Sequence, residues 1–338
     1  MNIRLFFTLA IIACICTACD FKRSNNKPML TPASSGNPYE VMVVAEDSVW
    51  EGYAGKELRT VLNKPVPMLP QDEPHFHVTH ILPQNYDRIT NKFRNIINFK
   101  IDDDFKQAKI FFERNVNAYP QAIVTIHAPS TRVASPYITE NTKSIIDFFY
   151  NEELARQQER LQFKYNQKFD KTMEEMFGYS MKIPQDISKI KKGKEFIWAS
   201  NDGLSTVQNI VVYAYPYVSE KVFDKNNFIE LRDTFMARNI PGYNPGSVMA
   251  TNKECVKVNN YYNNKGQFVQ EARGLWEMTG DAMGGPFISQ SRIDSLNNRV
   301  IVTEAFVYAP SKMKRSMLRR LEASLYTLKP VKRINNKK

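Results

Sequence analysis

Three of the four histidines in this 338-residue chain lie within six positions, at His75, His77 and His80. The residues around them alternate as they do on a β-strand, where His75 and His77 would point to the same side. Imidazoles are common zinc ligands, and His127, which ends a second apolar run, could join the pair from a neighbouring strand. One hypothesis is therefore a metal site formed by His75, His77 and His127, which with an acidic residue would make a metal-dependent hydrolase. The other is that these histidines are exposed or hydrogen-bonded on their strands.

A glycine-rich stretch between residues 273 and 287 offers a different kind of site. Four of the 13 glycines fall within it, and glycine allows the backbone to approach a ligand closely. Arginine and tryptophan side chains beside these glycines could bind a carboxylate, a phosphate or a sugar. The candidate ligand-binding residues are Arg273, Trp276, Asp281 and Phe287. The alternative is a strand end with a bulged loop, in which glycine provides the backbone geometry and Trp276 belongs to the core.

Motifs for nucleophilic catalysis or phosphate binding are absent from the sequence. There is no Gly-x-Ser-x-Gly, no His-Glu-x-x-His and no phosphate-binding glycine loop before a helix. The acidic residues at 102–104 and 174–175 are neighbours along the chain, so their carboxylates would not face one another across a substrate. Cys255 lies in a strand-like alternation, which favours a buried apolar side chain over a nucleophile. We therefore expect no cofactor and favour a protein that is not an enzyme.

The first 19 residues predict a covalent modification. A basic residue precedes an apolar segment of about 12 residues, which is too short to cross the hydrocarbon core of a bilayer. The segment ends in Cys16, Thr17, Ala18 and Cys19, a pattern similar to a bacterial lipobox. In such a motif the last cysteine becomes the new N-terminus and carries two or three acyl chains, which give durable membrane attachment. We predict a lipoprotein signal peptide at residues 1–18 and lipid attachment at Cys19, with an ordinary secretory signal as the alternative.

The net charge of +11 is concentrated near the C-terminus, where residues 312–338 hold ten basic residues and one glutamate. For a secreted protein we expect no nucleic-acid partner. Lipid headgroups or other anionic polymers of the envelope remain as a surface for this segment. The alternative is a solvated helix face followed by a frayed tail. After the signal, no run of about 18 apolar residues is present that could span a membrane.

The hydrophobic pattern predicts an α+β fold with two sheet-plus-helix domains joined through a long helix. Strands are expected near 40–45, 75–82, 110–116, 122–127, 179–183, 196–200, 209–217, 255–262, 267–278, 287–293 and 300–308. Helices are expected near 48–62, 89–96, 136–177, 226–238 and 311–328. A helix over 136–177 would be about 60 Å long, so we expect a break in it or a protruding arm. The predicted divisions are a signal peptide at 1–18, a flexible tether at 19–37, an N-terminal α/β domain at 38–177 that ends in the long helix, a C-terminal α+β domain at 178–330 and a basic tail at 331–338.

Short motifs distributed along the chain indicate a family relationship. They include Trp50-Glu51, Tyr119-Pro120-Gln121, Phe177-Gly178-Tyr179, Arg273-Gly274-Leu275-Trp276 and Phe306-Val307-Tyr308. In the order of these motifs the chain resembles an uncharacterised lipoprotein family of Bacteroidota, a domain of unknown function. This resemblance implies an envelope lipoprotein, and it carries over no activity and no functional residues. The second half also resembles the PsbP/Mog1 type of α+β sandwich through residues 178–184, which implies a fold and not a function.

These features favour a lipid-anchored protein of the cell envelope, on the outer membrane and facing the periplasm. We interpret it as a non-enzymatic binding or structural module of unknown biochemical activity. Its expected partners are the bilayer through acylated Cys19, an unidentified envelope protein or small ligand, and an anionic surface reached by the basic C-terminal helix. The metal-dependent hydrolase that would use His75 and His77 is the alternative.

Overall fold

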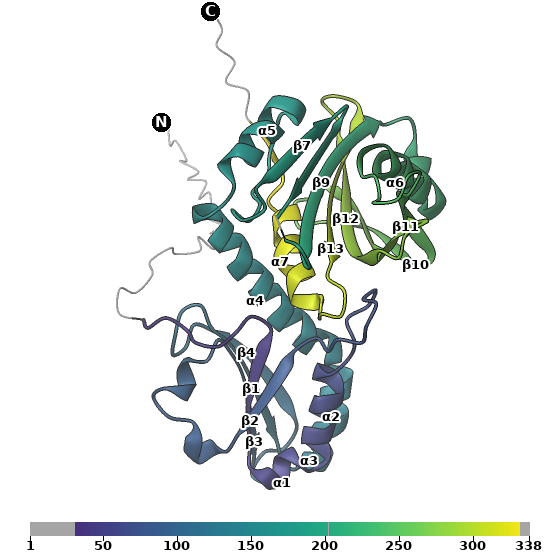
Figure 1. Ribbon diagram of the computed structural model, residues 1–338. Coiled ribbons are helices and arrows are strands. Elements are labelled where there is room, and N and C mark those ends of the chain that lie inside the picture. Colours follow the sequence, from purple (N-terminus) through teal and green to yellow (C-terminus); the bar gives the residue numbers. More distant parts are fainter. Residues whose placement is uncertain (1–30, 202, 332–338) are drawn as a thin grey trace, which may run out of the picture. The chain divides into compact units, whose positions relative to one another are not determined.

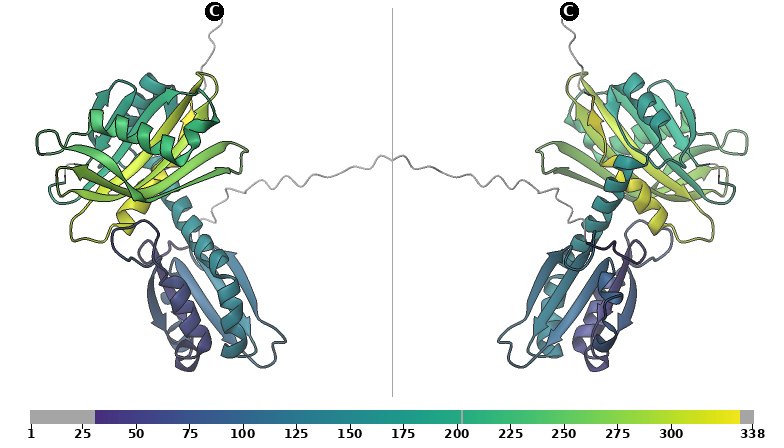
Figure 2. Two further views of the ribbon diagram at one scale, coloured as in Figure 1. Left: turned by 90° about the vertical axis from the view of Figure 1, so that its right-hand side faces the viewer. Right: turned by 90° about the vertical axis from the view of Figure 1, so that its left-hand side faces the viewer.

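The computed structural model describes residues 31–201 and 203–331, which form two large β-sheets with helices packed against them and a small two-stranded sheet (Figures 1 and 2). The predicted α+β fold class is confirmed. The signal peptide at 1–18 and Cys19 lie outside the described residues, as do residues 20–30 of the tether and 332–338 of the basic tail. Within the described ranges, no helix has the length and apolar character needed to cross a membrane.

The smaller sheet has five strands in the order β2-β1-β3-β5-β4. Every neighbouring pair in it is parallel except β4 with β5. The strands are β1 (Glu40–Val44), β2 (His77–Ile81), β3 (Asn95–Ile101), β4 (Lys109–Arg114) and β5 (Ala122–Ala128). Strands β1 and β5 are mostly apolar, because a parallel sheet is covered on both faces, whereas β3 also contains Asn95, Asn98 and Lys100.

Helices cover one face of this sheet and loops cover the other. The helices are α1 (Asp47–Trp50), α2 (Tyr53–Leu62), α3 (Thr131–Glu140) and α4 (Thr142–Phe163). Buried residues of α2, α3 and the first half of α4 form one core cluster with β1 and β5. A smaller cluster on the opposite face packs against Tyr86 and Phe93, which flank the short turns η1 (Pro83–Asn85) and η2 (Thr90–Lys92).

The larger sheet has seven antiparallel strands in the order β10-β11-β12-β13-β9-β8-β7. The strands are β7 (Lys189–Gly193), β8 (Phe196–Ser200), β9 (Val207–Pro216), β10 (Val248–Tyr262), β11 (Phe268–Thr279), β12 (Gly284–Asp294) and β13 (Arg299–Tyr308). A separate two-stranded ribbon joins β6 (Tyr179–Ser180) to β14 (Lys329–Pro330).

Each face of the larger sheet has its own helices and its own core. On one face lie α6 (Lys225–Asn239) and the turn η3 (Glu220–Phe223), which bury Phe228 and Met236 against β9 and β13. On the other lie α5 (Gln167–Phe177) and α7 (Arg315–Leu325), which bury Met173 and Leu321 against the same strands. Successive side chains on each strand point to opposite faces of the sheet, so each face contributes to a separate core.

One predicted helix is wrong in kind, and the longest predicted helix is divided as expected. Residues 89–96 form the turn η2 and the start of β3 instead of a helix. The reason is local, since the carboxylate of Asp87 accepts hydrogen bonds from the backbone N–H groups of Ile89 and Thr90 and so favours a turn. The expected break in helix 136–177 is present twice, at Asn141 and between α4 and α5, where Asn166 caps α5.

Helix α7 lies between the larger sheet and the first half of the chain. The described residues from Pro32 to Val331 belong to one compact unit, and α7 contacts α4 as well as strands β9, β12 and β13. Two backbone N–H groups at its start, those of Lys314 and Arg315, donate to the carboxylate of Glu73, at 2.5 and 2.9 Å. Arg319 donates to the carbonyl of His75 at 2.9 Å. The side chains of Lys314 and Arg315 also donate within the protein, to Gln71 and to the Pro74 carbonyl, so the basic residues at the start of this helix are largely used in internal contacts.

Candidate functional site

The structure does not bring the three candidate metal ligands together. His77 lies on β2 and His127 on β5, and two strands separate these in the sheet, which corresponds to about 14 Å at the usual strand spacing. His75 precedes β2, and its Nδ1 lies 2.9 Å from a guanidinium nitrogen of Arg319. Burial, together with the charges of Arg319 and Arg315, lowers the pKa of His75 to about 4. A ring held against a guanidinium is a poor position for a metal cation.

The remaining histidines of these strands have aromatic neighbours. His127 stacks on Phe105 and contacts Phe111, each with 4.8 Å between ring centroids. His80 stacks on Trp50, also at 4.8 Å, and its Nε2 lies 2.8 Å from the Ala45 carbonyl oxygen. Among the described residues, three or more ligating groups converge only in the exposed run 102–104. The geometry therefore gives no support to the predicted hydrolase centre.

The glycine-rich candidate site is also divided by the sheet. Arg273 and Trp276 alternate to opposite faces of β11. Arg273 is paired with Glu271 at 2.8 Å and with Glu322 of α7 at 2.5 Å. Trp276 is 2 % exposed and packs in the core on the α6 face. These two side chains therefore cannot hold one ligand between them.

The other two members of this candidate set lie apart from Arg273 as well. Phe287 is fully buried on the α6 face, where the guanidinium of Arg232 lies 4.1 Å from its ring centroid. Arg232 itself is fully buried and pairs with Glu304 at 2.8 Å. Asp281 lies in the turn between β11 and β12. The four residues form part of the sheet, its core and its turn, and they do not line a common cavity.

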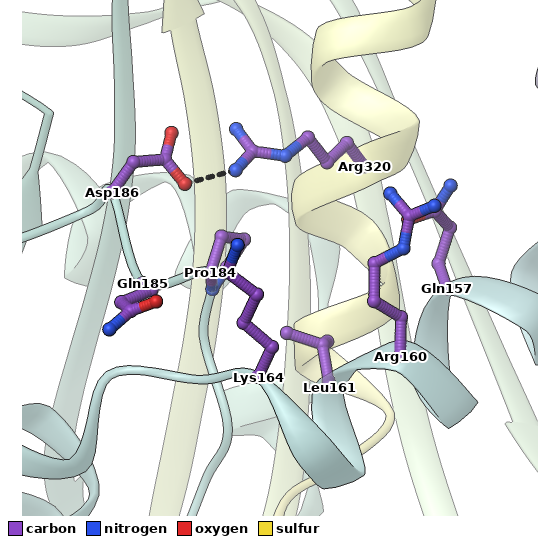
Figure 3. Close-up of a pocket in the computed structure, with 8 residues that line it drawn as sticks. All are labelled: Gln157, Arg160, Leu161, Lys164, Pro184, Gln185, Asp186 and Arg320. Atoms are coloured by element: carbon purple, nitrogen blue, oxygen red, sulfur yellow. Dashed lines mark hydrogen bonds and ion pairs between the residues drawn. The ribbon is translucent and has the colours of Figure 1, made fainter.

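A hollow of about 520 Å³ lies where α4 ends against α7 and the loop at 184–186 (Figure 3). Eight residues line it, namely Gln157, Arg160, Leu161, Lys164, Pro184, Gln185, Asp186 and Arg320. Its apolar floor is set by Leu161, which packs against Ala323 of α7. Three elements that are distant in sequence thus place polar side chains around one cavity.

The hollow has a positive balance of charge. It is lined by three cations and one carboxylate, and that carboxylate, Asp186, is paired with Arg320. Arg320 also donates to the side-chain oxygen of Gln208 at 3.1 Å. Within the described residues no ion pair involves Arg160 or Lys164, and both are exposed. These two cations are consequently available to a ligand.

The position of the two available cations follows from the end of α4. Arg160 lies in the last turn of the helix and Lys164 is the residue after it. Cations are favoured there by the partial negative charge of the helix C-terminus. A second hollow of about 450 Å³ shares Lys164 and Gln185 and adds Lys168. The cationic hollow, by which we mean the cavity around Arg160, Lys164 and Arg320, thus continues into a second basic surface.

This arrangement can bind an anion. Guanidinium and ammonium groups donate charge-assisted hydrogen bonds to carboxylate or phosphate oxygens, and Gln157 and Gln185 add neutral donors. Sequence reasoning did not find this site, because Arg160 and Lys164 lie in a helix whose charged residues indicate only a solvated face. Arg320 belongs to the basic C-terminal segment, and the excess of positive charge in that segment was the one sequence feature that pointed to anion binding.

Comparisons with known proteins give two matches to families without known function. Residues 166–327 match a domain of unknown function, DUF4837, and residues 34–162 match a second one, DUF8532. The two matches meet between α4 and α5. A search of curated proteins gave no match. The expected similarity to domains of unknown function is confirmed.

Three solved structures show a weak similarity to part of the chain. The Saccharomyces cerevisiae Ran-binding protein Mog1p is 9% identical over 46% of this chain and 90% of that one, with a TM-score of 0.29. A protein from Bacteroides thetaiotaomicron VPI-5482 is 15% identical over 45% of this chain and 44% of that one, with a TM-score of 0.19. The lipid transfer and protein localization domain of human StarD13 is 8% identical over 48% and 96%, with a TM-score of 0.20.

Proposed function

We propose that this protein is a lipid-anchored binding module of the cell envelope, held on the outer membrane through acylated Cys19 and facing the periplasm. We further propose that the cationic hollow binds an anionic group of its ligand or partner. The lipobox-like pattern at residues 16–19 supports the anchor. The observation that carries the binding proposal is that Arg160 and Lys164 border a hollow without a carboxylate partner among the described residues.

The chemistry of the hollow favours a phosphate or carboxylate over a neutral ligand. Two available cations at its rim would each contribute a charge-assisted hydrogen bond, which is worth about 1.5–3 kcal/mol when it is sheltered from water. Both cations are exposed, so the gain from each lies toward the lower end of that range, and Leu161 supplies an apolar contact. The anchor would hold this site close to a membrane surface, where anionic headgroups are concentrated.

The anchor is tested by Cys19→Ala. In cells supplied with a labelled fatty acid, the natural chain should incorporate label and fractionate with membranes. The variant should lose the label and appear in the soluble fraction, because it lacks the Cys19 thiol that the proposal makes the acylation site. Cys255→Ala is the matched control and should keep both properties. Unchanged labelling and fractionation of Cys19→Ala would refute the anchor.

The binding site is tested with the unanchored chain that carries Cys19→Ala. Its binding to vesicles of phosphatidylglycerol and phosphatidylcholine, to vesicles of phosphatidylcholine alone, and to inorganic phosphate distinguishes a lipid headgroup from free phosphate. We expect Arg160→Gln with Lys164→Gln to weaken binding at least tenfold and to reduce its dependence on salt. Arg88→Gln with Lys106→Gln removes two exposed cations elsewhere and should have little effect. If both double variants bind alike, the hollow is not the site.

A further inference from the structure

A third hollow, of about 460 Å³, is separate from the two described above. It lies beside the hairpin of β10 and β11 at the edge of the larger sheet (strands labelled in Figure 1). It lies on a different part of the chain from the cationic hollow and shares no lining residue with it. The residues that line it are Tyr217, Glu220, Lys221, Phe223, Asp224, Asn260, Tyr262, Phe268 and Ile293. We call it the aromatic hollow.

Four aromatic rings form a continuous row along this hollow. Ring centroids are 6.2 Å apart between Tyr217 and Phe223, 4.6 Å between Phe223 and Phe268, and 5.8 Å between Phe268 and Tyr262. Phe223 is buried and fixes the row to the core, whereas Tyr262 is 73 % exposed. Tyr262 meets Phe268 edge to face, so most of its ring stays in water and can stack on a ligand, at a low cost in conformational entropy because a tyrosine side chain has few rotatable bonds.

Polar groups with opposite hydrogen-bonding roles surround the row. Glu220 and Asp224 provide carboxylate acceptors, Lys221 provides donors, and the Asn260 amide provides both, and all four residues are exposed. Within the described residues no ion pair involves the two carboxylates or the lysine. The Asn260 side-chain oxygen is held by the buried amide of Gln270 at 3.2 Å. This contact orients the Asn260 amide before any ligand arrives.

We propose that the aromatic hollow binds a pyranose unit of a neutral glycan. A pyranose ring has an apolar face of C–H groups, which packs on an aromatic ring, and an edge of hydroxyls, each of which both donates and accepts hydrogen bonds. The row ending in Tyr262 suits the face, and the mixed carboxylate, amide and ammonium groups suit the edge. An anionic ligand would meet two carboxylates, and for a cationic ligand Lys221 offsets one of those carboxylates, so choline is the competing ligand that the experiment includes. A purely apolar ligand would leave these polar groups desolvated and unpaired.

The test measures calorimetric binding of maltohexaose, cellohexaose and chitohexaose to the chain that carries Cys19→Ala. We expect at least one of them to bind, and Tyr262→Ala to weaken that binding at least tenfold because the stacking surface is lost. Tyr262→Phe keeps the ring and should bind within about threefold of the natural residue. Tyr243→Ala is the matched control, since Tyr243 is 92 % exposed but does not line the hollow.

A separate variant tests the contribution of the polar groups around the aromatic hollow. Asp224→Ala leaves the aromatic row intact and should weaken binding of the same oligosaccharide about tenfold. Near-ultraviolet circular dichroism verifies that each variant is folded. The proposal is overturned if none of the three oligosaccharides binds at millimolar concentration. It is equally overturned if Tyr262→Ala binds as well as Tyr243→Ala, or if choline binds at this hollow and the sugars do not.

Discussion

His75 lies against two arginines of α7, and this position makes its protonation unfavourable in the folded protein. Arg319 approaches its ring and Arg315 adds a second positive charge, while Asp147 acts in the opposite direction. Burial is the largest cause of its low pKa, about 4. In the unfolded chain the pKa returns to about 6.5. In the folded protein His75 therefore remains a neutral imidazole between pH 6.5 and about 4, where it would be protonated in the unfolded chain.

The consequence is a pH dependence of stability with a definite sign. Between pH 6.5 and about 4 the unfolded chain takes up a proton at His75 and the folded chain does not, so the free energy of unfolding falls as the pH falls. We expect His75→Gln to flatten this slope in urea denaturation measured across that range. His77→Gln removes an exposed histidine of the same strand region and should leave the slope unchanged. Equal slopes for the natural chain and His75→Gln would contradict the assignment.

At the scale of single elements, helix α7 depends on a carboxylate from another part of the chain. Its own N-cap residue, Lys314, makes no side-chain capping hydrogen bond. Buried Glu73 replaces that cap, and both of its oxygens accept from the first backbone N–H groups. A negative charge at this end of a helix is also favoured by the helix dipole. The loop before β2 thus completes a helix whose first residue, Arg315, follows Glu73 by 242 residues.

Replacing this cap should destabilise the protein measurably. We expect Glu73→Gln to lower the free energy of unfolding by about 1–2 kcal/mol, because it removes the charge and one of two acceptors. Chemical denaturation with circular dichroism measures the change. Asp72→Asn, at the exposed neighbouring position, should change stability by less than about 0.5 kcal/mol. Equal effects of the two substitutions would show that Glu73 does not cap α7.

Helices and strands could be predicted from the sequence where a single hydrophobic periodicity extended over the whole element. Strands β8 and β13 and helix α6 lie within two residues of their predicted bounds, since their apolar patterns are long and regular. The segment at 89–96 was not predictable in this way, because its helical spacing rests on three residues and a side chain-to-backbone turn prevails. Strand β7 has few apolar residues, being at the sheet edge, and so left little signal.

The sites were less predictable than the elements, for a geometric reason. A strand pattern shows which side chains share a face but not which strands are neighbours, so His127 could be placed beside β2 only by assumption. The same limit applies to the cationic hollow, where Arg160 and Arg320 are separated by most of the second half of the chain. Only packing of α4 against α7 brings them to one cavity. The sequence contains the charges, and the tertiary fold supplies the site.

At the scale of the whole described unit, Glu322 connects the two sheets. It is fully buried on α7, accepts a hydrogen bond from the Tyr150 hydroxyl of α4, and pairs with Arg273 of β11 at 2.5 Å. Burial and the negative charge of Glu322 raise the pKa of Tyr150, so the hydroxyl remains protonated as the donor. The Glu322 carboxylate, on α7, therefore contacts both α4, which packs on the smaller sheet, and β11 of the larger sheet.

Because these contacts are shared, we expect the two sheets to unfold together. Hydrogen exchange with mass spectrometry in increasing urea should show β1 and β13 losing protection at one midpoint. Glu322→Ala leaves Arg273 with Glu271 alone and Tyr150 without its acceptor, at a cost of about 3 kcal/mol. In this variant the urea midpoint for β1 should fall below that for β13, since the five-stranded sheet has the smaller core.

Ser316→Ala, at an exposed position of α7, is the control and should preserve a common midpoint. If Glu322→Ala also kept a common midpoint, the Glu322 carboxylate would not couple the two sheets.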